Sequence, residues 1–167
     1  NSSMKSVGET MAIGMTFKES FQKALRSLEI GSWGFGGGKL GDDELPSKDV
    51  IKGKLVRPNA ERVFYLRYAF KAGFSAEEIF ELTKIDPWFI RQLEQISELE
   101  DEIKSKNLDT IDPDRLRLAK EYGFSDRQLG GLLDCPWNQV KEKRKSLGIE
   151  TVYRLVDTCA AEFSAET

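Results

Sequence analysis

Residues 73–79 read Gly-Phe-Ser-Ala-Glu-Glu-Ile, and residues 123–129 repeat the pattern as Gly-Phe-Ser-Asp-Arg-Gln-Leu. In each stretch the glycine is suited to ending one helix, and the serine, with Glu or Gln three positions later, is suited to capping the next. Matching residues recur with an offset of 50 or 49: Ala69/Ala119, Gly73/Gly123, Phe74/Phe124, Ser75/Ser125, Leu82/Leu132 and Trp88/Trp137. This repeat predicts two related helical units stacked on each other, because neither could bury its apolar face alone.

Prolines and capping residues set the other helix boundaries of this region. In the first unit, Asn59 is suited to capping one helix, and Asp86-Pro87 to starting a long one. In the second unit, Asp112-Pro113 and Pro136-Trp137 start helices in a similar way, and Gly148 closes the last of them. The predicted fold is mainly α, an irregular helical array of two related helical units.

The chain before the repeat has a different pattern. Residues 10–14 read as a short buried strand, and Thr16 with Glu19 forms a capping box for a helix that runs to about Ile30 and ends at Gly31. At the other end of the chain, residues 151–156 alternate like a second strand. Because a lone strand leaves backbone groups unpaired, short peripheral strands of this kind are expected to pair with neighbouring domains.

The composition excludes several kinds of chemistry. None of the 167 residues is histidine, which excludes Ser-His and Cys-His nucleophile pairs and histidine metal sites. The net charge of −3 argues against a general nucleic-acid binder. No apolar run approaches the roughly 18–20 residues that span a bilayer, and the first residues lack the apolar core of a signal peptide. Cys135 and Cys159 form no metal or redox motif, as is typical of proteins in a reducing compartment.

Two local patterns have ordinary explanations. Residues 36–41 match G-x-G-x-x-G, but a dinucleotide site needs a strand before the motif and a helix after it. Here the motif lies in a glycine-rich stretch and is followed by Asp-Asp-Glu at 42–44, so a flexible surface connection is predicted. A short helix is expected to follow at 47–55. The acidic residues 98–102 lack the spacing of a calcium loop and are predicted to form a solvated helix face.

The three tryptophans have no assigned function at this level. Trp88 and Trp137 each follow a proline at a helix start, and both are predicted to pack against the preceding helix. Trp33 lies among glycines, where an exposed contact with a neighbour is one possibility that the sequence does not decide.

A helix-turn-helix interpretation stays open as an alternative function. Residues 119–129 and the helix 137–147 have the spacing of a DNA-reading module. The basic side chains available to phosphates are Lys141, Lys143, Arg144 and Lys145. Against this, the first unit leads into a helix rich in acidic residues, which DNA would repel. The alternative is a DNA-binding regulator that uses helix 137–147.

Six stretches resemble the large subunit of carbamoyl-phosphate synthetase, and they occur in that family's order. The stretches are Met4–Glu9, Met11–Gly14 and Ser20–Glu29 for the end of the first ATP-grasp unit, Glu81–Phe89 and Gly123–Gln128 for the helical oligomerisation domain, and Val156–Phe163 for the entry to the second synthetase half. The likeness covers nearly the whole chain. The family usually has arginine where this chain has Met15.

The resemblance implies four segments and a non-catalytic role. They are 1–30, the C-terminal end of the carboxyphosphate ATP-grasp unit; 31–45, a glycine-rich connection; 46–148, the helical oligomerisation domain; and 149–167, a linker into the second synthetase half. The implied parent is a cytoplasmic ligase (in the plastid stroma if the source is a plant). From bicarbonate, glutamine-derived ammonia and two ATP with magnesium, it makes carbamoyl phosphate for arginine and pyrimidine biosynthesis.

The same resemblance implies partners but no site residues here. The expected partners are other copies of the large subunit, the synthetase halves that flank this segment and, for the parent, a glutaminase small subunit. No nucleic acid or membrane partner is expected. No catalytic, cofactor-binding or metal-binding residue is assigned to this chain, because the family's phosphate and metal ligands lie outside it.

Overall fold

A computed structural model describes residues 10–28, 31–36 and 44–150 of the chain. The helices in these residues are α1 (Phe17–Ser27), α2 (Lys48–Val56), α3 (Arg62–Lys71), α4 (Ala76–Thr83), α5 (Pro87–Lys104), α6 (Pro113–Glu121), α7 (Asp126–Leu132) and α8 (Trp137–Ser146). The predicted mainly α fold is confirmed. None of the described helices combines the length and the apolar character needed to cross a membrane.

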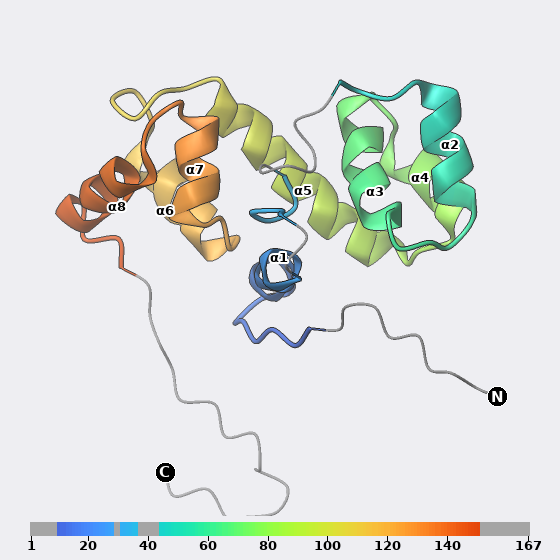
Figure 1. Cartoon of the computed structure of the whole chain (residues 1–167), viewed down its shortest axis with the longest axis horizontal. Coiled ribbons are helices and arrows are strands. Elements are labelled where there is room, and N and C mark those ends of the chain that lie inside the picture. The colour runs from blue at the N-terminus through green and yellow to red at the C-terminus, as the bar shows by residue number, and fades with distance from the viewer. Residues whose placement is uncertain (1–9, 29–30, 37–43, 151–167) are drawn as a thin grey trace, which may run out of the picture.

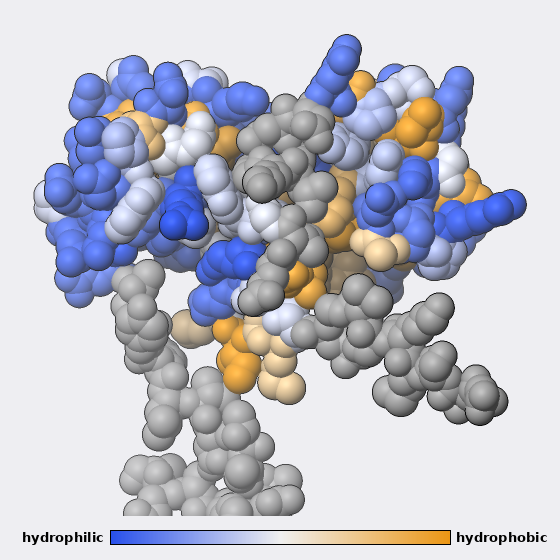
Figure 2. Space-filling view, in the orientation of Figure 1, coloured by the Kyte–Doolittle hydropathy of each residue, from blue (hydrophilic) through white to orange (hydrophobic). Residues whose placement is uncertain are grey.

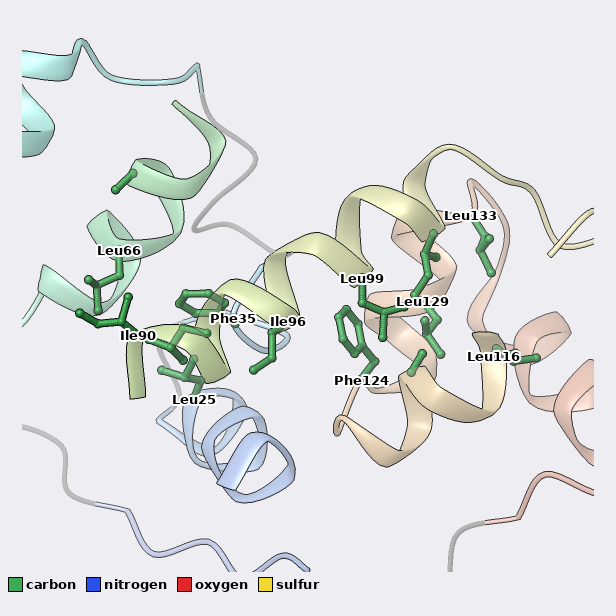
Figure 3. Close-up of a cluster of buried hydrophobic side chains, with 14 of the residues drawn as sticks. Leu25, Phe35, Leu66, Ile90, Ile96, Leu99, Leu116, Phe124, Leu129 and Leu133 are labelled. Atoms are coloured by element: carbon green, nitrogen blue, oxygen red, sulfur yellow. The ribbon is translucent and has the colours of Figure 1, made fainter. Parts of the chain in front are cut away.

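The long helix α5 connects two lobes (Figure 1). Helix α2 packs against α3 and α4, both of which pack against α5, and α7 packs against α8 and the far part of α5. Figure 3 shows Ile90 of α5 near Leu66 of α3, and Leu99 near Leu129 and Phe124 of the second lobe. The two units therefore lie at opposite ends of α5 and share a core through it, rather than stacking directly on each other.

The internal repeat is confirmed by the backbone. Gly73 and Gly123 adopt left-handed conformations with φ of 83° and 88°. Lys84 and Asp134, also 50 positions apart, are the two non-glycine residues with positive φ in the described chain. The prolines that follow them are 49 positions apart, so the one-residue change of offset lies in the turn before the third helix of each unit.

Most predicted helix starts are confirmed. The side chains of Ser47, Asp86 and Asp112 accept hydrogen bonds from backbone N–H groups at the starts of α2, α5 and α6. Ser75 forms the full reciprocal capping box with Glu78. Ser125 accepts a hydrogen bond from Gln128 N at 3.1 Å as predicted, but the Gln128 side chain does not complete the reciprocal box, because neither of its polar atoms has a hydrogen-bond partner.

Two predicted caps are wrong in detail. Thr16 accepts from Glu19 N at 3.2 Å, but the Glu19 carboxylate accepts from Met15 N at 2.8 Å instead of closing the box on Thr16. Asn59 caps no helix directly, because α3 begins three residues later with Glu61 as its N-cap. The Asn59 side chain instead accepts from Glu61 N at 3.0 Å and forms the turn that leads into the helix.

The first predicted strand does not form within the described residues. Residues 10–14 form no strand, and no other strand forms within the part of the chain that the structure describes. A strand needs a hydrogen-bonding partner, and no described segment provides one to these residues. The helix α1 ends at Ser27 rather than near Ile30, and residues 29–30 and the second predicted strand, 151–156, lie outside the described residues.

Candidate association surface

Three aromatic rings meet where α1 and α5 begin. The centroid of the Phe17 ring lies 5.5 Å from that of Trp88 and 5.1 Å from that of Phe89, and the Trp88 and Phe89 rings are 5.0 Å apart. All three pairs have the edge-to-face geometry that aromatic side chains favour. We refer to Phe17, Trp88 and Phe89 as the aromatic edge.

The aromatic edge connects the surface to the core. Trp88 is 52% exposed and Phe89 42% exposed, which are high fractions for such large apolar side chains. Phe17 stacks on Phe21 at 5.5 Å, and Phe21 meets the fully buried Phe35 at 5.4 Å. The exposed rings are thus held in place from beneath, so the edge is a fixed apolar surface.

The segment leading into α1 extends this surface. Met11, Ile13 and Met15 are exposed, with Met15 at 70%, and the two residues between them are less exposed. Lys23 Nζ donates to the Ile13 carbonyl at 3.2 Å, which holds the segment against α1. Figure 2 shows hydrophobic side chains gathered around α1 at the foot of the molecule, between the two lobes. We refer to residues 11–15 as the approach segment.

Polar contacts fix α1 in its place between the lobes. Lys18 Nζ donates to Gln92 Oε1 of α5 at 2.7 Å. Gln22 Nε2 donates to the Tyr122 carbonyl at 3.1 Å, and Arg26 Nη1 donates to the Gly123 carbonyl at 2.7 Å. The turn that ends α6 therefore binds α1, a contact between the repeat and the chain before it that the repeat pattern does not predict.

Neither Trp88 nor Trp137 is buried, and the Trp137 backbone lies against the preceding helix α7, since a Cβ at Gly130 would be 3.2 Å from its N and Cα. The Trp88 ring contacts Phe17 of α1 and remains half exposed. Trp137 is also about half exposed, with Lys141 Nζ 6.0 Å from its ring centroid. One sequence signal for the exposed edge exists: Trp88 and Phe89 precede Ile90, and a helix cannot turn three consecutive apolar residues toward one core.

The acidic residues 98–102 do not form a uniformly solvated face. Glu100 is 2% exposed and pairs with Arg67 of α3, with Arg67 Nε donating to Oε2 at 3.0 Å. Gly36, the one described glycine of the G-x-G-x-x-G match, covers this pair, since a Cβ there would lie 2.6 Å from Arg67 Nε. No group of three or more Cys, Asp or Glu side chains is placed to hold a metal among residues 10–28, 31–36 and 44–150.

The DNA-binding alternative loses one of its basic residues. Arg144 is buried, and its Nε donates to Asp126 Oδ1 at 2.9 Å while Nη1 donates to the Ile149 carbonyl at 3.2 Å. A guanidinium held in this way closes the second lobe and is not available to a phosphate backbone.

The family of the chain follows from a sequence comparison. The profile of the carbamoyl-phosphate synthetase large chain, oligomerisation domain, matches residues 9–148. This range covers the aromatic edge, both lobes and the helix that joins them. The chain belongs to this family.

Comparison with individual relatives of this oligomerisation domain supports the same family. The chain is 55% identical over 168 residues to the carbamoyl phosphate synthase large chain of Rhodopirellula baltica, 50% over 167 to that of Synechocystis sp. and 48% over 170 to that of Archaeoglobus fulgidus. These alignments cover 98–100% of this chain but only 15–16% of the relatives. The chain thus spans about one-sixth of the length of the large chains it matches, and nothing in the comparisons supports the DNA-binding alternative.

Proposed function

We propose that this chain is a non-catalytic connecting and oligomerisation segment of a carbamoyl phosphate synthase large chain. The parent would be a ligase that makes carbamoyl phosphate from bicarbonate, glutamine-derived ammonia and two ATP with magnesium, for arginine and pyrimidine biosynthesis. The names of the relatives, together with the one-sixth of their length that this chain spans, support the proposal. The reacting groups and the contacts with a glutaminase subunit would then lie in the flanking synthetase halves.

The connecting role rests on the exposed apolar surface formed by the aromatic edge and the approach segment. An exposed apolar surface held rigidly from beneath is typical of an interface with another polypeptide. We assign its occupant as a flanking synthetase half of the same large chain. Two observations favour this partner: most of each relative lies outside the matched region, and the approach segment shows the alternating exposure of a strand that lacks its sheet.

Footprinting with hydroxyl radicals tests this assignment. Met15 and Trp88 are expected to be modified rapidly in the isolated chain and at least about tenfold more slowly in the intact large chain, because a docked half removes them from solvent. Trp137 is an internal control, since it is about as exposed as Trp88 but lies in the second lobe, away from the edge. Equal modification of Trp88 in the two proteins would contradict docking at the edge.

Self-association is the second part of the proposed role, and the family description of an oligomerisation domain supports it. Sedimentation velocity of the 167-residue chain between about 1 and 100 μM is expected to show a concentration-dependent shift from monomer to a larger species. A chain that stays monomeric throughout this range would count against the proposal.

A double variant tests whether copies of the isolated chain associate through the aromatic edge or through another surface. Phe89→Ser together with Trp88→Ser removes the two exposed rings, and we expect the sedimentation shift to persist because a flanking half, not a second copy, occupies the edge. A variant that is folded but monomeric at all concentrations would show instead that copies associate through the edge. Circular dichroism of the variant checks that the fold is retained.

A further inference from the structure

A cleft of about 480 Å³ lies between α1, residues 31–33 and the start of α7 in the second lobe. Its lining residues are Arg26, Gly31, Ser32, Trp33, Ser125 and Arg127. This volume falls in the range of about 300–1,000 Å³ that is typical of small-molecule sites. The cleft lies away from the aromatic edge, at the opposite end of α1, so it is not explained by docking of a synthetase half.

The two arginines of the cleft have no direct carboxylate contact among the described residues, although the charge of Glu19 acts on Arg26. Arg26 uses one N–H of its guanidinium on the Gly123 carbonyl, and Arg127 is exposed. Neither forms an ion pair with a carboxylate of the described residues. Two carboxylates on the neighbouring helices already have cations: Asp126 is shared by Lys120 at 3.1 Å and Arg144 at 2.9 Å, and Glu19 is paired with Lys23.

The surroundings of the cleft are correspondingly cationic. Burial lowers the pKa of Lys120, the positive charges of Arg144 and Arg26 lower it further, and Asp126 partly opposes them. In a chain whose net charge is −3, this local excess of positive charge is a property of the fold rather than of the composition.

Trp33 provides the apolar wall of the cleft. Its indole lies over Gly131 of α7, where a Cβ would be 3.3 Å from Cζ3 of the ring. The absence of a side chain at 131 therefore makes room for the ring. Ser125 Oγ donates to the Trp33 carbonyl at 3.5 Å, which also holds this residue at the second lobe.

We propose that this cleft binds a small phosphomonoester, with Arg26 and Arg127 holding the phosphate and Trp33 flanking the organic group. Guanidinium groups form paired, charge-assisted hydrogen bonds with phosphate oxygens. A flat organic group would lie against the indole, as aromatic faces favour. This site is independent of the proposed connecting role and is assigned from the cleft alone.

An NMR titration with phenyl phosphate, with total ionic strength kept constant by sodium chloride, tests the site. Saturable shifts are expected for the Arg26 and Arg127 Nε–H signals and for the Trp33 indole N–H. Arg127→Gln is expected to weaken binding at least about tenfold, because it removes charge-assisted hydrogen bonds. Arg91→Gln is the matched control, since Arg91 is an exposed arginine of α5 whose contact with Glu77 is loose, at 3.6 Å, and it should leave the affinity unchanged.

Three results would overturn the assignment. They are shifts that do not saturate, an Arg127→Gln variant that binds phenyl phosphate as tightly as the parent chain, and equal shifts with sodium sulfate. Inorganic phosphate serves as a further probe and is expected to bind more weakly than phenyl phosphate. Equal affinity for the two would show that Trp33 does not contact the organic group. Because Arg127 is exposed and makes no described contact, its substitution leaves the fold intact, which the unchanged signals of the first lobe would verify.

Discussion

Alanine in place of Glu100 is expected to lower the free energy of unfolding by about 3–5 kcal/mol. Glu100 lies on α5, and its buried carboxylate binds Arg67 Nε at 3.0 Å, while Lys71 Nζ lies 3.5 Å from Oε2. Arg67 is itself buried on α3. The substitution removes the carboxylate that this buried guanidinium binds, and breaking a buried ion pair by removing one partner is strongly destabilising.

Urea denaturation of two further variants makes this expectation specific. Asp101→Asn changes the neighbouring carboxylate, which is 62% exposed and also binds Lys71, and it should cost no more than about 1 kcal/mol. Glu100→Met combined with Arg67→Met should recover most of the loss, because a buried ion pair and a matched apolar pair have similar stabilities. A large loss in Asp101→Asn, or a small one in Glu100→Ala, would contradict the importance of burial.

The second large effect is expected at one of the two duplicated glycines. Gly73 and Gly123 have nearly the same φ, 83° and 88°, so alanine at either position enters the left-handed region at a cost of about 1–2 kcal/mol. The surroundings differ. A Cβ at Gly73 meets nothing within 4 Å, whereas one at Gly123 would lie 2.8 Å from Cα of Glu19 on α1.

Gly123→Ala is therefore expected to cost about 1–3 kcal/mol more than Gly73→Ala, because the backbone of α1 must move. Thermal or urea unfolding of both variants measures the difference, and each glycine serves as the control for the other. The hydrogen bonds from α1 to Tyr122 and Gly123 should weaken too, so faster amide exchange in α1 is expected in Gly123→Ala alone. Equal losses at both glycines would show that α1 does not press on the second lobe.

Both predictions concern contacts that bring separate parts of the chain together. The Arg67–Glu100 pair joins α3 to α5 beneath Gly36, and Gly123 lets α1 approach the second lobe. A connecting segment must hold its two ends in a constant orientation. Rigid contacts of this kind between the lobes, α5 and α1 are consistent with that role.

Local features could be predicted from the sequence because neighbouring residues decide them. The capping serines, Pro87 and Pro113 locate helix starts within a residue or two, since a cap acts on N–H groups of the next turn. The repeat is also a property of the sequence itself. Asn59 and the Thr16–Glu19 box are exceptions: the Asn59 side chain forms a turn instead of a helix cap, and the Glu19 carboxylate binds Met15 N.

Features that join distant residues could not be predicted in this way. Residues 10–14 have the composition of a strand, but strand formation depends on a partner that no described segment supplies. Glu100 was expected in solvent because its neighbours are acidic, and only the position of Arg67, 33 residues away, accounts for its burial. The exposed aromatic edge likewise depends on where α1 meets α5.

The sequence alone thus determined the helices, most of their caps, the duplication and the family resemblance. The tertiary structure decided how the repeats are arranged along α5, which apolar rings remain exposed, which charges are buried, and that Arg26 and Arg127 line one cleft. The physical reason is the sequence separation over which each interaction acts. Helix propensity and capping act over about one turn, whereas burial and charge pairing depend on contacts between residues that are far apart in the chain.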